Sequence, residues 1–339
     1  MKRKILSLAF CILALNSMTV WATDLKESNI EYSELIYNTE EINTQEYEIT
    51  SMKVSKDNIV IEYSGESEFI DVIATLPDGS EINISDCADW DSSDNEVAFA
   101  DRGRVLALNA GSAEITVSFG EFSQKIIVKV TNKIDIANII DELNDGIVLL
   151  SSSMETARDM VEYQWTPTSD VRGWRNKKTF KANTTYMGIP YSQTANQVNK
   201  QIFENAMKTT DFYANYTRTL NGETIIMPKY GNDCSGFVSF AWGISRQTTS
   251  SFISGIKNGT YTKVGNYDAN NPTSTDLKAS YKNLSAGDAV VKNGHTFLIA
   301  SNDTKNSKVY AYEQTPYVAV YTTWTYDSMA NAKYMPFRN

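Results

Sequence analysis

Apolar and polar residues alternate in short stretches between residues 49 and 131, and this alternation predicts β-strands. Ile59, Ile61 and Tyr63 alternate with polar residues, and Pro77-Asp78-Gly79 has the composition of a turn. Further apolar stretches follow at short and even spacing, at residues 69–74, 97–99, 105–108, 115–117 and 126–130. Strands spaced in this way predict an all-β sandwich over residues 49–131.

The apolar period changes after residue 132. Ile136, Ile139 and Ile140 recur at helical spacing, and residues 154–165 form a second predicted helix. The rest of the chain mixes helical and strand patterns. We therefore expect a multidomain protein, in which the sandwich is followed by an α+β domain over residues 133–339 with the two helices as its N-terminal extension.

The first 22 residues have the composition of a secretory signal peptide. A basic start at residues 2–4 precedes an apolar run at residues 5–15, which is too short to cross a bilayer. Val20-Trp21-Ala22 matches the recognition positions of a signal peptidase, so we expect cleavage after Ala22 and export.

A lipid anchor at Cys11 is not expected, because Phe10 occupies a position that requires a small residue. The acidic stretch 23–48 is expected to form a linker. No later stretch approaches 18 unbroken apolar residues. We therefore expect a secreted protein, extracellular or associated with the cell wall, without stable membrane insertion.

Composition and charge exclude some classes of function. The chain is 42% apolar and 21% charged, which is too apolar for a disordered protein. Its formal net charge is −10, yet residues 133–339 hold 21 basic against 18 acidic residues. A mildly basic domain suits an anionic target such as the cell wall. No dense stripe of Lys and Arg indicates nucleic acid.

The segment Asn232-Asp233-Cys234-Ser235-Gly236 carries the strongest chemical signal. Polar loop residues precede Cys234, and the apolar positions after it have helical spacing. Cys234 is therefore expected at a helix N-terminus, where the helix dipole and unpaired N–H groups favour a thiolate. The segment alone leaves two readings open, a nucleophile or a buried core cysteine at the start of a helix.

His295 is the only histidine of the chain and follows an Asn-Gly pair that predicts a hairpin turn. Any imidazole base must therefore be His295. A third polar group normally orients such an imidazole, and the next predicted strand offers Glu313 and Gln314. Their side chains face opposite sides of a strand. Glu313 is favoured and Gln314 is the alternative.

Other catalytic chemistries lack their residues. One histidine and the two cysteines left after signal cleavage, Cys87 and Cys234, do not build a His-rich zinc site, so no metal or cofactor is expected. A Ser-His-Asp hydrolase would need a Gly-x-Ser-x-Gly elbow, which the sequence lacks. A disulfide between Cys87 and Cys234 is arithmetically possible but not expected, because the two fall in separate predicted domains.

Three ordered motifs resemble the NlpC-type family of bacterial cell-wall cysteine peptidases, within the papain-like group. They are Asp233-Cys234-Ser235-Gly236, Gly287-Asp288 and Gly294-His295, with further likeness at Gly188-Ile189-Pro190-Tyr191 and at residues 245–249. The resemblance implies a papain-like fold with Cys234, His295 and Glu313 as catalytic residues. It also implies that Tyr191, Asp233 and Ser235 bind substrate. Glu313 departs from the family, in which the third position is commonly His, Asn or Gln.

The same resemblance implies the substrate, a peptidoglycan stem peptide cut between D-γ-glutamate and a diamino acid. An amidase of the same group would use the same residues on the sugar–peptide amide. A transglutaminase-like enzyme shares the order of Cys and His, but would be expected to have a clearer aspartate as third member.

The segment 49–131 resembles the bacterial immunoglobulin-like domain of the intimin and invasin type. The resemblance is carried by residues 90–93, 97–98 and 103–105 and by the run at residues 110–117, which begins Ala110-Gly111-Ser112-Ala113. It implies a spacer or adhesion module at the bacterial cell surface. A non-catalytic surface adhesin is therefore the alternative from a different class of function.

Overall fold

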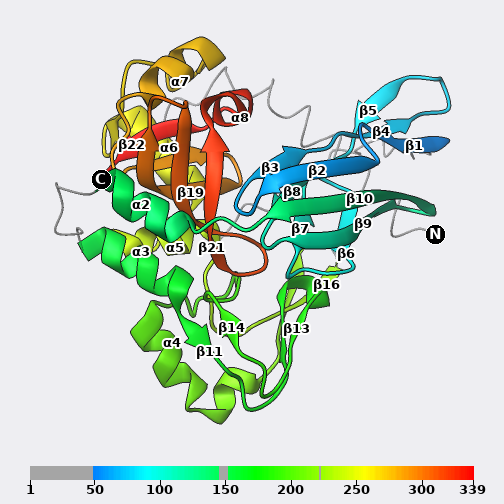
Figure 1. Ribbon diagram of the computed structural model, residues 1–339, viewed down its shortest axis with the longest axis horizontal. Coiled ribbons are helices and arrows are strands. Elements are labelled where there is room, and N and C mark those ends of the chain that lie inside the picture. Colours follow the sequence, from blue (N-terminus) through cyan, green and yellow to red (C-terminus); the bar gives the residue numbers. More distant parts are fainter. Residues whose placement is uncertain (1–48, 145–151, 221–222) are drawn as a thin grey trace, which may run out of the picture. The chain divides into compact units, whose positions relative to one another are not determined.

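The computed structural model describes residues 49–144, 152–220 and 223–339, and these residues form two compact units (Figure 1). The first unit contains Glu68–Leu106, Gly111–Lys129 and the described residues up to Val60. The second contains Val130–Asn339 with two short stretches, Ile61–Ser67 and Ala107–Ala110. The fold is thus multidomain and rich in β-structure. The predicted signal peptide and acidic linker lie outside the described residues.

Short antiparallel and mixed sheets make up residues 51–132. The strands are β1 (Ser51–Val54), β2 (Asn58–Tyr63), β3 (Ser67–Phe69), β4 (Val72–Thr75), β5 (Glu81–Asn83), β6 (Asp89–Ser92), β7 (Ala98–Asp101), β8 (Arg104–Ala107), β9 (Gly111–Phe119) and β10 (Phe122–Asn132). They form sheets in the orders β1-β4-β5, β2-β10-β9-β6 and β3-β8-β7. Buried and less buried residues alternate along β9 and β10, as expected for strands with one face on a core. Trp90 in that core donates its indole N–H to the carbonyl of Ser85 at 3.0 Å.

One predicted strand of this segment is wrong. Residues 69–74 form the end of β3 and the start of β4 instead of one strand. Between them the backbone N–H of Ile70 donates to the Gly103 carbonyl at 2.7 Å, and that of Asp71 donates to Oγ of Ser55 at 2.9 Å. These bonds divert the backbone from a continuous ladder, although the apolar pattern runs through the break.

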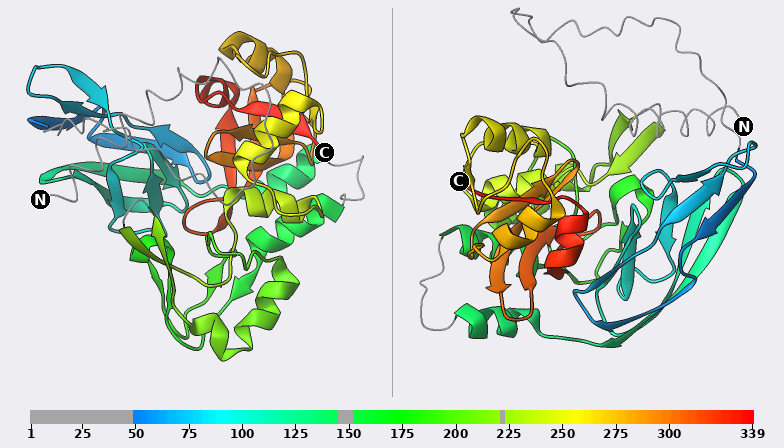
Figure 2. Two further views of the ribbon diagram at one scale, coloured as in Figure 1. Left: turned by 180° about the vertical axis from the view of Figure 1, so that it is seen from behind. Right: turned by 90° about the horizontal axis from the view of Figure 1, so that it is seen from above.

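The second unit is built on a six-stranded sheet in the order β17-β22-β18-β19-β20-β21 (Figures 1 and 2). Its strands are β17 (Thr262–Lys263), β18 (Ala289–Lys292), β19 (His295–Asp303), β20 (Lys308–Gln314), β21 (Ala319–Thr325) and β22 (Met335–Arg338). The strand pairs are antiparallel. Helix α5 (Cys234–Ala241) packs against β19 and β20, and α3 (Ser152–Glu162) packs against α5, β20 and β21.

The remaining elements complete this unit. They are α2 (Ile136–Asn144), β11 (Gln164–Trp165), β12 (Val171–Arg172), η2 (Trp174–Asn176), β13 (Thr179–Phe180), β14 (Tyr186–Met187), α4 (Lys200–Met207), η3 (Thr210–Tyr213), β15 (Tyr216–Leu220), β16 (Glu223–Met227), α6 (Thr249–Asn258), α7 (Ser274–Tyr281) and α8 (Tyr326–Asn331). None of the helices among the described residues is both long enough and apolar enough to cross a membrane.

The predicted helix 154–165 is too long at its C-terminal end. α3 ends at Glu162, and Trp165 instead belongs to strand β11, which pairs with β14. The Trp165 indole donates to the Gly188 carbonyl at 2.9 Å and packs edge-on against Phe203. Tertiary contacts of this aromatic side chain therefore override the helical pattern.

An ion pair joins Asp288, the residue before β18, to Arg338, the last residue of β22, and it predicts that the stability of a variant depends on pH. Asp288 is buried and accepts from Arg338 at 2.7 Å and from the backbone N–H of Ser285 at 2.9 Å. Burial raises the pKa of Asp288, and Arg338 and the Ser285 bond oppose that rise. The ionised carboxylate is therefore costly without its cation.

We expect Arg338→Met to destabilise the protein by about 1–2 kcal/mol at pH 7, since Arg338 is partly exposed. Without the cation the pKa of Asp288 rises further above its unfolded value. The destabilisation must then shrink as the pH falls through that pKa, because the protonated carboxyl no longer needs a cation. Urea unfolding at pH 7 and pH 5 measures this. An equal loss at both values would contradict the assignment.

Candidate active site

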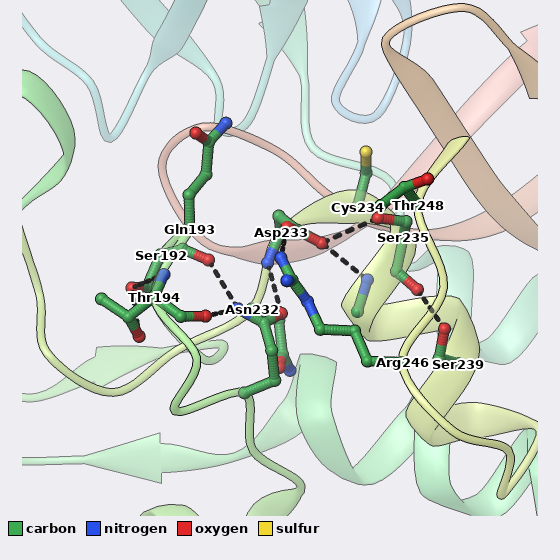
Figure 3. Close-up of polar contacts among 12 residues, drawn as sticks. Ser192, Gln193, Thr194, Asn232, Asp233, Cys234, Ser235, Ser239, Arg246 and Thr248 are labelled. Carbon is green, nitrogen blue, oxygen red and sulfur yellow. Dashed lines mark hydrogen bonds and ion pairs between the residues drawn. The ribbon is translucent and has the colours of Figure 1, made fainter. Parts of the chain in front are cut away.

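Cys234 is the first residue of α5, and Asp233 caps the helix (Figure 3). Oδ1 of Asp233 accepts from the backbone N–H of Gly236 at 2.7 Å and from Oγ of Ser235 at 3.0 Å. This is the N-cap arrangement that satisfies a free N–H group in the first turn. The thiol of Cys234 therefore lies at the positive end of a helix, as the sequence predicted.

Helix α5 is buried on nearly all sides, and Cys234 is 7% exposed. Cys234 takes part in no disulfide, so the prediction that it is not bonded to Cys87 is confirmed. Its Sγ lies 3.9 Å from the carbonyl oxygen of Gly294, the residue before His295. The hairpin that carries the only histidine thus meets the start of the cysteine helix.

The chain enters α5 through a fixed loop. Asn232 is fully buried, and its side-chain amide exchanges two hydrogen bonds with the backbone of Val198, at 2.8 and 2.7 Å. Its backbone N–H donates to the Pro190 carbonyl at 3.1 Å, and Tyr191 forms a parallel bridge with it. These bonds fix where Cys234 begins its helix.

Gln197 is a second anchor of this loop, and the sequence analysis missed it. Its Oε1 accepts from the backbone N–H of Asp233 at 2.9 Å, and its Nε2 donates to the carbonyls of Ser192 and Thr194 at 3.0 and 2.8 Å. A Cβ on Gly236 would lie 1.8 Å from that Oε1. The glycine of the Asp-Cys-Ser-Gly motif is therefore required because the Gln197 amide occupies the space. No sequence signal marks a single Gln 36 residues before the motif residue that it binds.

The segment 246–249 joins the cysteine helix to the histidine hairpin. Arg246 forms an ion pair with Oδ2 of Asp233, and the backbone N–H of Gln247 donates to Oγ of Ser239 in α5 at 2.9 Å. Oγ1 of Thr249 accepts from the backbone N–H of Gly294 at 3.3 Å. The family resemblance at residues 245–249 singled out this stretch in the sequence, but it did not predict these contacts.

His295 opens β19 and contacts a buried carboxylate. Its Nε2 lies 2.8 Å from Oε1 of Glu313, which has no exposed surface. Lys292 pairs with His295 across a two-residue turn, and the φ of +82° at Gly294 explains the glycine there. Because a carboxylate only accepts, Nε2 carries the shared proton and Nδ1 is the imidazole's acceptor nitrogen.

The second carboxylate oxygen of Glu313 also accepts hydrogen bonds. Oε2 accepts from Oγ1 of Thr322 at 2.8 Å and from Nε1 of Trp324 at 3.0 Å, both on the neighbouring strand β21. Gln314 lies on the opposite face of β20, where its Nε2 donates to the carbonyl of Ile189 at 3.1 Å. Of the two candidates for the third position, Glu313 is the one that meets His295.

Aromatic rings surround this pair. The His295 ring lies 6.2 Å from the rings of both Phe297 and Tyr334, measured between centroids. Phe297 stacks on Trp324 with centroids 5.0 Å apart. These three aromatic side chains are buried, so the hydrogen bond between His295 and Glu313 lies beside a medium of low dielectric constant.

The predicted substrate-binding residues occupy different positions. The side chains of Asp233 and Ser235 bond to each other within the helix cap. Tyr191 is 9% exposed, and its hydroxyl accepts from Nε2 of Gln193 at 2.9 Å, while its ring packs against Trp174. The bridge to Asn232 brings the backbone of Tyr191 next to the loop before Cys234.

No family model matches the chain, and no curated protein matches it. Three solved structures of the S-layer protein SbsC are similar to parts of it. Domains 4 and 5 share 18% sequence identity with this chain and match 25% of it and 53% of their own length, with a TM-score of 0.22. Domains 1–6 share 14% identity and match 54% of this chain and 22% of their own length, with a TM-score of 0.23. Domains 5–6 share 13% identity and match 55% of this chain and 87% of their own length, with a TM-score of 0.22. The chain spans about half of the first of these structures. TM-scores this low do not establish a common fold. Within the residues described, no group of three or more His, Cys, Asp or Glu side chains could hold a metal ion.

We expect Gly236→Ala to destabilise the protein by about 1–3 kcal/mol, because the added methyl displaces Gln197 from three hydrogen bonds. Thermal or urea unfolding measures this. In a Gln197→Ala background the space is open, and the same substitution should cost little or even stabilise the helix. An equal cost in both backgrounds would mean that Gln197 is not the reason for the glycine.

Proposed function

We propose that this protein is a cysteine peptidase with a papain-like catalytic domain, in which Cys234 is the nucleophile, His295 the base and Glu313 the orienting group. One observation carries the proposal. Nε2 of His295 lies 2.8 Å from the buried carboxylate of Glu313, while Sγ of Cys234 lies 3.9 Å from the residue before that histidine. A nucleophile, a base and a buried orienting group are the three members that a catalytic triad requires.

In the proposed reaction these three residues act in turn. Nδ1 of His295 takes the proton of the Cys234 thiol, and the thiolate attacks the carbonyl carbon of the scissile amide. The imidazolium then protonates the leaving amine, and a thioester forms on Cys234. Water hydrolyses the thioester with His295 as base, which releases the acid and restores the thiol.

The start of α5 supplies the electrostatic stabilisation. The N–H of Gly236 donates to Asp233, and other backbone N–H groups at the start of α5 would bind the oxyanion. Arg246 neutralises part of the charge of Asp233. The carboxylate that caps the helix therefore opposes the thiolate less strongly than an unpaired one would.

The substrate that we propose is a peptidoglycan stem peptide, cut between D-γ-glutamate and a diamino acid. The three ordered motifs at Cys234, Asp288 and His295 support this class. So do the predicted export and the excess of basic residues in 133–339. We further propose that residues 49–131 form an immunoglobulin-like module that attaches the enzyme to a bacterial cell surface. In the helix cap, Asp233 and Ser235 would act mainly as positioning residues.

Incubation of peptidoglycan with the wild-type chain should release fragments split after γ-glutamate, and Cys234→Ala should release none. Mass spectrometry of the muropeptides identifies the bond. A split at the lactyl amide would make the protein an amidase instead. If wild type cleaved no wall type, or if Cys234→Ala retained full activity, the proposal would be wrong, and the first result would favour a non-catalytic adhesin.

Glu313→Gln should lower kcat by about tenfold or more with little change in KM, because an amide holds the imidazole without stabilising its charge. Steady-state hydrolysis of a released muropeptide measures both constants. In this variant the amide NH₂ group would take the position of Oε2, where it would face two donors, Thr322 and Trp324. Because this can destabilise the protein, its unfolding must be measured as well. An unchanged kcat in a folded variant would remove Glu313 from the mechanism.

A further inference from the structure

A hollow of about 320 Å³ lies beside the hairpin that β12 and β13 form. Its volume is in the range of small-molecule sites, but every side chain that lines it carries a polar or charged group. These side chains include Asp170, Arg172, Asn176, Thr179, Lys181 and Asn215. Such a lining favours a hydrophilic ligand.

The strand register places the charged residues of this hollow on one face of the hairpin. Arg172 and Thr179 are direct partners in the antiparallel pairing, so their side chains project to the same side. Asp170 and Lys181 lie two positions further along and share that side, where they form an ion pair at 2.9 Å. The residues between them, Val171 and Phe180, are buried. The hairpin therefore has one face on the core and one polar face.

Arg172 gives the hollow a positive charge that is not neutralised. Its Nη1 donates to Oδ1 of Asn176 at 2.9 Å, and no carboxylate among the described residues pairs with it. Asp170 is the one carboxylate in the lining, and it accepts from Lys181 and from the backbone N–H of Ala182, both at 2.9 Å. Two cations against one carboxylate leave the hollow with a net positive charge.

Neutral donors accompany this charge. Asn176 and Asn215 contribute side-chain amides, and Thr179 contributes a hydroxyl. Donors from both strands, from the turn and from the chain after η3 suit the tetrahedral oxygens of a phosphate group, which only accept hydrogen bonds. The guanidinium of Arg172 also fits a phosphate with two parallel N–H groups.

The positive charge extends along the hairpin beyond the hollow. Residues 170–181 contain five basic residues and one acidic residue, an excess of four. The whole of 133–339 has an excess of three, from 21 basic and 18 acidic residues. The basic character of this domain is thus concentrated on one hairpin, which suits a ligand with repeated negative charges better than a single ion.

The same hairpin reaches the proposed active site. Its turn carries Trp174, whose ring packs against Tyr191 with centroids 5.0 Å apart. The backbone of Tyr191 forms a bridge with Asn232, two residues before Cys234. A polymer held on the hairpin would therefore keep the enzyme on the material that surrounds its substrate.

We infer that this hollow binds a phosphodiester group of a polyol phosphate polymer of the cell wall, and that the hairpin 170–181 anchors the enzyme to that polymer. One phosphate would occupy the hollow beside Arg172, and neighbouring phosphates would meet the other cations of the hairpin. Binding of this kind requires no hydrolysis, so it is separate from the reaction proposed at Cys234.

Isothermal titration calorimetry of the full chain with a synthetic glycerol phosphate hexamer tests this inference. Wild type and Cys234→Ala should bind equally, and Arg172→Gln should bind about tenfold more weakly because a charge-assisted contact is lost. Thr179→Val changes no charge, yet it should weaken binding by about threefold. Lys257→Gln is the matched control, because it removes an exposed cation of α6 and should bind like wild type.

Asp170→Asn tests the same site by a gain of affinity. It removes the carboxylate of the lining and releases Lys181, so it should bind the hexamer about threefold more tightly. A misfolded variant would not bind more tightly, so this result does not depend on how well the weakened variants fold. An affinity equal to or below that of wild type would count against the inference.

Inorganic phosphate and hexaglutamate are the comparison probes, and each should bind at least about tenfold more weakly than the hexamer. Equal binding of inorganic phosphate would make the hollow a site for the free ion, and equal binding of hexaglutamate would remove the preference for phosphate. Either result would overturn the inference. So would no binding of the hexamer, wild-type affinity in Arg172→Gln, or an equal loss in Lys257→Gln, which would indicate a diffuse attraction between charges. None of these results bears on hydrolysis, which the cleavage of peptidoglycan tests separately.

Discussion

The carboxylate of Glu313 is fully buried, and burial of an ionised group is unfavourable unless the surrounding structure supplies donors. Three groups provide them: His295 on β19, and Thr322 and Trp324 on β21. The central strands of the sheet must therefore keep their register for the carboxylate to remain satisfied. A shift of one residue in β20 would turn Glu313 to the other face and Gln314 toward the histidine. The orientation of the imidazole is in this sense a property of the whole sheet.

The cysteine is held by a separate set of bonds, which start from the loop before α5. Asn232 and Gln197 bind that loop to the backbone around Val198 and Ser192, and Asp233 then caps the helix. The segment 246–249 connects the start of α5 to the histidine hairpin. Arg246 forms an ion pair with the capping residue Asp233, and Thr249 accepts a hydrogen bond from the backbone N–H of Gly294. The proposed catalytic pair would need this kind of support, since small displacements of reacting groups reduce rates strongly.

Local patterns predicted the parts of the site that depend on local structure. The polar loop followed by helical spacing placed Cys234 at a helix start, and the Asn-Gly pair placed His295 at the start of a strand. Strand alternation separated Glu313 from Gln314, but only the neighbouring strands show which one meets the histidine.

The remaining contacts come from residues far apart in the sequence. Gln197, Thr249 and Trp324 carry no local mark of their roles, since each acts through a residue between 11 and 45 positions away. At Trp165 a local pattern gave a wrong prediction: the residue was expected in a helix, but aromatic contacts and a strand pairing override its helical spacing.

The central claim is that His295 activates Cys234, and the rate of Cys234 alkylation by iodoacetamide at pH 6 tests it most directly. Peptide mapping by mass spectrometry separates Cys234 from the other cysteines and follows wild type and His295→Gln in parallel. Because only the thiolate reacts, we expect wild type to be alkylated at least about tenfold faster than His295→Gln, with both proteins folded. Equal rates in the two proteins would show that the imidazole does not activate the thiol, and would contradict the account.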